Sequence, residues 1–334
     1  MATQQQFLDF LSEIEPSSST KAVCSSAHNT LRDKLASHET YKAIHVHTYL
    51  SGSYARNTAL RPRMLNGTLR RPDVDIIVIT SHTQDDRPSD VIAKLRRALK
   101  QVGYEEIESN RRSVCVKLGT VEMDVVPIIE DHWNPGRWLI ADKSEERWIE
   151  TNPNGHTEWA VRVNKKANSN FKPLVKLMKW WRRENLPHLR RPKGFIIETL
   201  VAELMDYKES RFEEIFIKLL ERIQSEYEWT VAMGWVPNLQ DPSVPGNNVF
   251  SRVKAEEFKR FYDQAASHAV LARRAQKEQD ADKALALWQK VFGDRFKKPA
   301  AKATGLLQAV AATGAGLTFP DRAVGLPNKP PGFA

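Results

Sequence analysis

The chain has 334 residues, of which 41% are hydrophobic and 27% are charged, so it can bury a sizeable core and wholesale disorder is excluded. The 50 basic residues exceed the 41 acidic ones and give a net charge of +9, which either serves solubility or suits phosphate-rich partners such as nucleotides and nucleic acid. The two cysteines, Cys24 and Cys115, lie in no metal-binding cluster, which argues against a structural zinc or a disulfide framework. Without a signal-peptide pattern or an apolar run of membrane-span length, we expect a cytoplasmic protein that makes no membrane contact.

Helical and strand patterns alternate along the first half of the chain. Amphipathic spacing predicts three helices, over 4–14, 21–37 and 89–102. Ser19 or Thr20 is the expected N-cap of the second helix, and Ser89 is that of the third. Alternating β-branched and aromatic residues predict strands over 43–50, 74–80, 113–118, 120–128 and 137–141.

From about residue 151 onward, helical patterns dominate. They cover 156–168, 171–186, 194–206, 211–227, 251–277 and 280–293. We therefore predict an α+β fold in three parts: a mixed-sheet lobe over 1–150, a helical lobe over 151–296 that closes a cleft, and a flexible Ala-, Gly- and Pro-rich tail over 297–334.

Two aspartates begin the strand pattern DVDIIVIT. Asp73 and Asp75 are two residues apart, so both side chains point to one face while the residues between and after them can enter a core. Two like charges on one face raise a pKa or attract a cation, and Mg²⁺ takes one or two carboxylates together with phosphate oxygens. This pair therefore predicts a magnesium site.

Asp124, in the later strand pattern GTVEMDVVPII, is the best candidate for a third carboxylate. Three carboxylates can hold two metal ions ~3.5–4 Å apart, a geometry used for in-line phosphoryl or nucleotidyl transfer. Asp124 would lie nearest the attacking hydroxyl, as a metal ligand and candidate general base. Each acid alone also fits a solvated strand end or a salt bridge, but their order along the predicted elements favours catalysis.

A Gly-Ser turn precedes the acidic pair. Gly52 lets backbone N–H groups approach a phosphate closely, and the following turn directs its positive end there. The Ser53 hydroxyl can donate to the same phosphate, and Arg56 is placed to neutralise it. Alone, a Gly-Ser pair is more often an ordinary turn.

This succession resembles the DNA polymerase beta-like nucleotidyltransferase superfamily. GSYARNTALRP followed by DVDIIVI looks like the bacterial cyclic-oligonucleotide synthetases (the cGAS/DncV-like, CD-NTase/SMODS group), relatives of cyclic GMP-AMP synthase and oligoadenylate synthetase that act in anti-phage (CBASS) defence. The resemblance covers residues 50–127 well, and ALALWQKVFGDRF at 284–296 is similar to a segment of many such synthetases. The segment between Ser53 and Asp73 is longer than in the shortest family members, and the chain lacks the zinc-binding thumb insertion of the animal DNA sensor.

In the helical half, FKPLVKLMKWWRRENL has an apolar stripe that predicts core packing and a basic stripe of lysines. The basic stripe fits a solvated face, but the resemblance implies that one lysine reaches the donor triphosphate. Lys179 matches that position, with Lys176 as the alternative. At the next helix the family carries Ser then Tyr, where this chain has Gly194 and Phe195. Phe195 either stacks on the donor base or packs in the core.

The resemblance implies transfer of nucleoside monophosphates from NTPs, ATP among them, to a ribose hydroxyl, with two Mg²⁺ ions (or Mn²⁺) and release of pyrophosphate. Ring closure would give a cyclic di- or trinucleotide second messenger. Two alternatives stay open: transfer to linear oligoadenylate or an RNA 3′ end, and a catalytically silent sensor of nucleotides or nucleic acid. Some relatives are attached to targets by a ubiquitin-like ligase, and a tail ending in Ala334 fits either such attachment or an ordinary frayed terminus.

Overall fold

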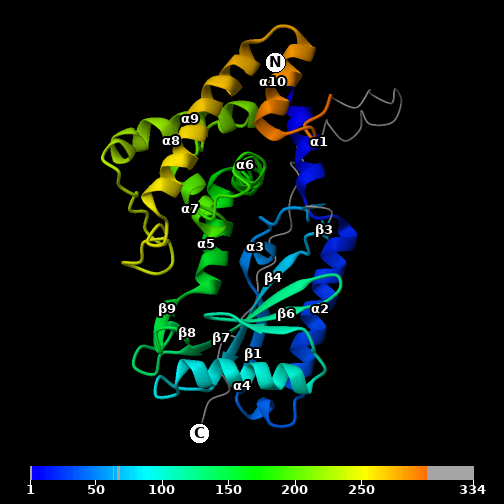
Figure 1. The fold of residues 1–334 in the computed structure, drawn as a ribbon, viewed down its shortest axis with the longest axis vertical. Helices are drawn as coiled ribbons and strands as arrows, with labels where there is room; N and C mark the ends of the chain where they lie inside the picture. The colour runs from blue at the N-terminus through cyan, green and yellow to red at the C-terminus, as the bar shows by residue number, and fades with distance from the viewer. Residues whose placement is uncertain (1, 63, 66–67, 299–334) are drawn as a thin grey trace. The chain divides into compact units, whose positions relative to one another are not determined.

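The computed structural model in Figure 1 describes residues 2–62, 64–65 and 68–298. Their contacts divide them into a sheet unit, residues 17–56 and 62–161, and a helical unit, residues 2–16, 57–61 and 162–298. Both units are assembled from separate chain segments. The functional division at residues 150 and 296 stays a prediction, and the predicted tail from residue 299 onward, with Ala334, lies outside the described residues.

A mixed sheet forms the centre of the sheet unit, with strands in the order β1-β4-β7-β6-β5, and with β8 pairing β7 and β9 pairing β8. The strands β4 and β7 are parallel, and the remaining pairs in this sheet are antiparallel. The bounds are β1 His45–Leu50, β4 Asp73–Thr80, β5 Ile107–Ser109, β6 Val114–Lys117, β7 Glu122–Glu130, β8 Trp138–Asp142 and β9 Arg147–Thr151; β2 Met64–Leu65 and β3 Thr68–Leu69 pair separately.

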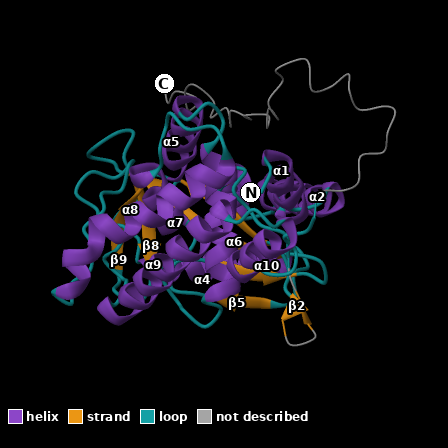
Figure 2. Cartoon of the chain, turned by 90° about the horizontal axis from the view of Figure 1, so that it is seen from above, coloured by secondary structure: helices purple, strands orange, loops and turns teal. Residues whose placement is uncertain are grey.

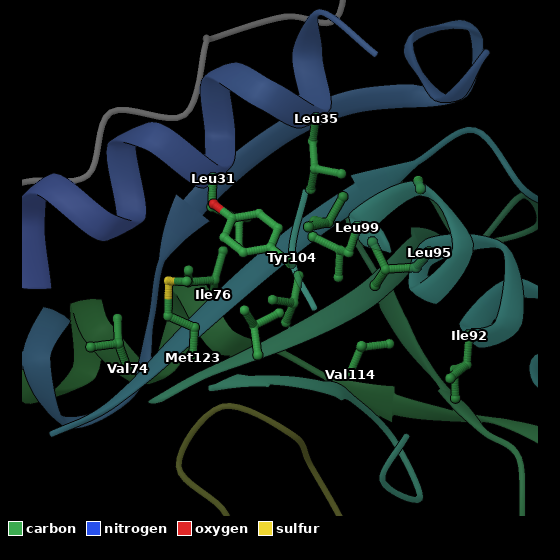
Figure 3. Packing of buried hydrophobic residues seen from close by; sticks show 14 of the residues in the cluster. Leu31, Leu35, Val74, Ile76, Ile92, Leu95, Leu99, Tyr104, Val114 and Met123 are labelled. Atoms are coloured by element: carbon green, nitrogen blue, oxygen red, sulfur yellow. The ribbon is translucent and has the colours of Figure 1, made fainter. Parts of the chain in front are cut away.

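One face of this sheet is covered by helices α2 (Ser18–Ala36) and α4 (Pro88–Gln101). Leu31 and Leu35 of α2, and Leu95 and Leu99 of α4, pack with Ile76 of β4 in one core (Figure 3). The prediction that alternate residues of the DVDIIVIT strand enter the core is confirmed. This core fixes which face of β4 remains for its aspartates.

Two predicted helix caps are wrong. The second helix begins at Ser18, and the Ser17 hydroxyl caps it by accepting a hydrogen bond from the Thr20 backbone at 3.1 Å. The helix over residues 88–101 has Arg87 at its N-cap and Pro88 at its first position, where a missing N–H costs no helical hydrogen bond. The helical turn expected after the Gly-Ser pair is confirmed as α3 (Gly52–Ala55), whereas the short strands β5 and β9 were not predicted from the sequence.

The helical unit buries a cluster of aromatic rings. Phe7 of α1 packs edge-on against Trp288 and Phe296, each with ring centroids 5.2 Å apart, so the 284–296 run is a core segment. Figure 2 shows the helices of this unit in purple. Their bounds are α1 Gln4–Ile14, α6 Phe171–Asn185, α7 Phe195–Leu204, α8 Phe212–Ala232, α9 Ala255–Lys277 and α10 Ala281–Phe292; α5, Pro153–Lys166, crosses the division between the units. Among helices of the described residues, none has the length and apolarity to cross a bilayer.

Candidate active site

The parallel pairing of β4 with β7 brings the acidic residues of the two strands together. Asp75 is in register with Asp124, and Asp73 with Glu122. Residues in register on neighbouring strands share a face, with backbones ~4.8 Å apart. The four carboxylates therefore lie on the sheet face opposite the α2 and α4 core, at the end where β4 and β7 begin. Asp73 is exposed, and the other three are half-buried. Glu122 has no role in the sequence-based prediction, and the register alone reveals it as a neighbour of Asp73.

Further along the same face, the polar end gives way to an apolar one. Ile77 and Ile79 of β4 pack with Ile128 of β7 and Tyr49 of β1 in a small buried cluster. The strand is therefore anchored on both faces over most of its length, while its first residues remain accessible. Such anchoring holds a reactive group in place at little conformational cost.

Gly52 lies directly against Asp75. The Ser51 backbone N–H donates to the Asp75 carbonyl at 2.8 Å, and Gly52 follows with φ +64°, a left-handed conformation that favours glycine. A Cβ atom at this position would lie 1.7 Å from Asp75 Oδ2. The carboxylate thus occupies the space of the missing side chain, a reason for glycine that the sequence did not reveal.

Ser53 lies in the short helix that follows, where it is half-buried, and Arg56 ends that helix as a buried residue. The Arg56 backbone N–H donates to the Gly52 carbonyl at 3.2 Å. This bond closes the turn, and the bond from the Ser51 N–H to the Asp75 carbonyl keeps its start beside Asp75. The phosphate-binding roles of Gly52, Ser53 and Arg56 remain predictions.

Two side chains that the sequence did not single out hold the Asp124 carboxylate. The Ser113 hydroxyl donates to Asp124 Oδ1 at 3.0 Å, and Asn110 Nδ2 donates to the same oxygen at 3.2 Å. Both belong to the connection between β5 and β6, which their hydrogen bonds fold back over Asp124. Within the described residues, no group donates to Oδ2, so that oxygen is available to a ligand.

Cys115 of β6 is the register partner of Asp124 on the other side of β7. Burial and the negative charge of Asp124 raise the pKa of its thiol to about 11. The thiol is therefore protonated at neutral pH, and a thiolate nucleophile at this position is excluded. The chemistry of this face rests on carboxylate oxygens.

Within the described ranges, no three His, Cys, Asp or Glu side chains are grouped closely enough to enclose a metal ion by themselves. Mg²⁺ seldom uses an all-protein cage, because it usually keeps waters and is completed by substrate phosphates. The hard oxygen donors of Asp73, Asp75 and Asp124 fit such an ion chemically.

In the helical unit, the apolar stripe of α6 is core, as predicted. The interpretation of the basic stripe as a solvated face is wrong for Lys172, Lys176 and Lys179, which are at most 9% exposed. They can be buried because polar partners compensate the charges. Lys176 Nζ, for example, donates to Glu15 Oε1 at 2.7 Å.

Lys179 lies in a buried polar cluster. Its Nζ donates to Glu198 Oε1 at 2.7 Å and to the Thr58 hydroxyl at 3.1 Å, and that hydroxyl donates to the same glutamate oxygen at 2.9 Å. Glu198 is one turn beyond Phe195 on α7, and Phe195 is half-buried. The cluster also holds the segment Asn57–Arg61 within the helical unit. The nucleotide-binding roles of Lys176, Lys179 and Phe195 remain predictions.

Comparison with known proteins defines the class first by fold. The structure superposes on that of Escherichia coli MS115-1 CdnC with ATP, with a TM-score of 0.70, 20% identity, and coverage of 89% of this chain and 99% of the other. This likeness establishes the fold, and the predicted α+β nucleotidyltransferase architecture is confirmed.

Sequence comparison then identifies the family. Residues 1–164 match the Second Messenger Oligonucleotide or Dinucleotide Synthetase domain. The chain is 55% identical to a cyclic AMP-AMP-AMP synthase of Acinetobacter sp. over 100% of this chain and 98% of the relative. It is 28% identical to a cyclic AMP-AMP-GMP synthase of Enterobacter hormaechei over 90% and 93%. The chain therefore belongs to the Second Messenger Oligonucleotide or Dinucleotide Synthetase family, whose members are nucleotidyltransferases that synthesise cyclic oligonucleotides.

Proposed function

We propose that this chain joins three adenylate units from ATP into cyclic AMP-AMP-AMP in a Mg²⁺-dependent reaction. The choice of three adenylates is supported by the 55% identity to a synthase named for that product. The observation that carries the chemistry is the register of Asp75 with Asp124, which places two carboxylates side by side at the accessible end of a rigid sheet.

The residues present suit in-line nucleotidyl transfer. Asp73, Asp75 and Asp124 would hold Mg²⁺, which when bound neutralises phosphate charge and acidifies a hydroxyl. A ribose hydroxyl forms a bond to the α-phosphorus of ATP, the bond from that phosphorus to the bridging oxygen breaks, and pyrophosphate leaves. Asp124 Oδ2 accepts the hydroxyl proton, while Asn110 and Ser113 hold Oδ1 in place.

Further groups are proposed to bind the nucleotide. In this proposal, the backbone at Gly52 and the hydroxyl of Ser53 bind the triphosphate, and Arg56 adds charge. Lys179, with Lys176 as the alternative, contributes the lysine of the helical unit, and the half-buried ring of Phe195 stacks on the donor base. The three adenylates are joined in two rounds of transfer, and a third, within the chain, closes the ring.

The product can be identified directly. Purified protein is incubated with all four labelled NTPs and Mg²⁺ or Mn²⁺, treated with phosphatase, and the surviving species is weighed by mass spectrometry. We expect a phosphatase-resistant ring of three adenylates, absent from Asp73→Ala although that variant keeps the wild-type melting temperature. Turnover retained in Asp73→Ala would refute the metal assignment.

The other functions give different results in the same assay. A linear oligoadenylate synthetase yields a product whose terminal phosphates are removed, and an RNA 3′-end transferase needs added RNA. A silent sensor binds NTP without releasing pyrophosphate. We favour the cyclic product, because the relative that matches the whole chain is a cyclic synthase.

We further propose that the product serves as a second messenger in anti-phage (CBASS) defence, in keeping with the motif resemblance at residues 50–127. Cells that carry the protein with its genomic neighbours should plate phage less efficiently than cells carrying Asp73→Ala. Equal plating would contradict this role while leaving the enzymatic proposal intact. Attachment of the tail at Ala334 to a target by a ubiquitin-like ligase, and a nucleic-acid ligand, remain predictions.

A further inference from the structure

A hollow of about 520 Å³ lies in the sheet unit beside α4. One stripe of that helix lines it, with residues spaced as on a single helical face, and the strand β5 and Lys143 complete it. The lining residues on α4 are Ser89, Ile92, Ala93, Arg96, Arg97 and Lys100. The volume lies within the range of ~300–1,000 Å³ typical of small-molecule sites.

The hollow has a strongly positive lining. Arg96, Arg97, Lys100 and Lys143 all face it, and none of its lining residues is acidic. Across the described part of the chain, the side chains of the first three make no hydrogen bond or ion pair, although Arg96 is half-buried. Lys143 Nζ donates to the Ser109 carbonyl at 2.9 Å. Such a concentration of like charges is unfavourable without an anion.

The lining is not purely ionic. Ile92 belongs to the buried core (Figure 3), and Ile107 of β5 packs against that core, so the wall is rigid and partly apolar. The hydroxyls of Ser89 and Ser109 add polar groups. At one end, Glu146 accepts a hydrogen bond from the Ser89 backbone at 3.4 Å. Apolar wall, hydroxyls and cations together match a base, a sugar and several phosphates.

This hollow is separate from the carboxylate centre. The helix α4 covers the core face of the sheet, whereas Asp73, Asp75 and Asp124 belong to the opposite face. The strand β5 is also the edge of the sheet, with β7 and β6 between it and β4. A ligand here would leave the catalytic carboxylates untouched.

We infer that the hollow lined by Arg96, Arg97, Lys100 and Lys143 is a second binding site for a nucleoside polyphosphate. The guanidinium groups bind phosphate oxygens, the lysines add charge, and Ile92 and Ile107 contact the base or sugar. Its source is either the NTP substrate or another phosphorylated nucleotide of the cell, and both share this chemistry.

Calorimetry with a non-hydrolysable ATP analogue and Mg²⁺ tests the site in the full chain. We compare the wild-type protein with Arg97→Glu and with Lys94→Glu, a charge reversal on the same helix outside the hollow. We expect the wild-type protein to show, beside nucleotide binding at the carboxylate centre, a further binding event that depends on Arg97. Arg97→Glu should weaken that event at least about tenfold, because it removes a charge-assisted contact, while Lys94→Glu leaves it intact.

Inorganic triphosphate and the cyclic product serve as competitors for the Arg97-dependent event. Displacement by inorganic triphosphate supports the assignment of the phosphates to this hollow. Displacement by a nucleoside diphosphate or by the cyclic product at a lower concentration than by an NTP would assign the site to another phosphorylated nucleotide, and the reverse order to the substrate. If the charge reversal in Arg97→Glu disturbs folding, the milder variant Arg97→Ala replaces it in the titration. Arg97→Ala should weaken the same binding event.

Three results would overturn the inference: no binding event that depends on Arg97, equal weakening by Arg97→Glu and Lys94→Glu, or an Arg97-dependent preference for duplex nucleic acid over the analogue. The last would make the hollow part of a nucleic-acid surface. The product assay with Asp73→Ala is independent of all three, so failure here leaves the proposed reaction standing.

Discussion

The two units differ in the exposure of their charged residues. In the sheet unit, Asp73, Asp75 and Asp124 gather on one face at the accessible end of β4 and β7. In the helical unit, Lys179 and Glu198 are buried and paired with each other. Desolvation makes an unpaired buried charge costly, whereas charges at a surface remain solvated until a ligand arrives. The first arrangement leaves its charges accessible to a ligand, and the second pairs its charges inside the helical unit, where the pair also contributes to stability.

This difference between accessible and buried charges applies to the carboxylate face and the Lys179–Glu198 pair, and not to every charged residue of each unit. Asp142 of the sheet unit is also buried, and ion pairs with Arg111 and Arg112 hold the pKa of its carboxyl well below its usual range. It therefore belongs with the structural charges. Substitutions should separate the two kinds cleanly: one kind lowers activity at constant stability, and the other lowers stability itself.

The largest effect is expected at Asp75. Asp75→Asn removes a negative charge from the proposed metal-binding face, and activity should fall at least about a thousandfold, since metal stabilisation is worth several kcal/mol. The midpoint of urea unfolding should change little, because the carboxylate is half-buried at a strand end. Steady-state turnover and urea titration measure the two quantities, and a parallel fall in both would break the comparison.

Glu198→Ala should act on stability. It leaves Lys179 buried without its carboxylate, so the free energy of unfolding should fall by about 3–5 kcal/mol. Asp263→Ala is a matched control, because the exposed Lys259–Asp263 pair has the same 2.7 Å separation, and such surface pairs contribute ~1 kcal/mol or less. Equal losses in the two variants would show that burial does not set the difference.

His268 gives the helical unit a pH dependence. It accepts a hydrogen bond from Trp181 Nε1 on Nδ1 at 3.0 Å, and burial lowers its pKa from 6.5 to about 4. The neutral form is therefore favoured in the folded state, so this stabilisation is complete above pH ~6.5 and is lost as the pH falls toward 4. The difference in unfolding free energy is on the order of 3 kcal/mol.

Urea unfolding of the wild-type protein and of His268→Leu between pH 4 and pH 7 isolates this contribution. The variant should show a shallower decline on acidification, because it has no ring to protonate. Identical slopes in the two proteins would assign the acid sensitivity to other groups.

Gly52→Ala tests the close contact between the turn and Asp75. The new Cβ would meet Asp75 Oδ2, and the left-handed backbone adds strain, so the carboxylate must move. Displacement of about 1 Å can cost a hundredfold in rate. Gly119→Ala is the control, because no atom lies within 4 Å of its added Cβ. Normal turnover in Gly52→Ala would argue that the position of Asp75 is not critical.

The smallest effect is expected at Ser113. Ser113→Ala removes one of two hydrogen bonds to Asp124 Oδ1, so kcat should fall about tenfold, as for other groups that orient metal ligands, with little change in KM for ATP. The pH profile of kcat should shift, and Ser113→Thr should restore part of the rate. A change in KM alone would point to a role in substrate binding.

Several features of the molecule are predictable from local residue patterns. The alternation in DVDIIVIT set Val74, Ile76 and Val78 into the core and Asp73 and Asp75 onto the other face, because the side-chain period of a strand is two. The amphipathic spacing of α6 likewise identified its apolar stripe. These patterns are local, and local periodicity survives without knowledge of distant partners.

Contacts between distant segments could not be predicted in this way. The basic stripe of α6 looked solvated because Glu15, Thr58 and Glu198, which compensate its lysines, lie far away in the chain. The same holds for Ser113 and Asn110, whose importance depends on the pairing of β6 with β7. Nothing in a hydroxyl or an amide marks it as the partner of one particular aspartate.

The sequence by itself determined most of the longer helices and strands, the common face of Asp73 and Asp75, and the family, because each depends on residues close together in the chain. Only the tertiary structure decided that Asp124 lies beside Asp75 and that Lys179 is buried with Glu198. It also decided that the Asp75 carboxylate occupies the space where a side chain at Gly52 would lie. The physical reason is that strand register and buried charge pairs are settled by the folding of remote segments onto one another, where packing and desolvation act on the whole chain at once.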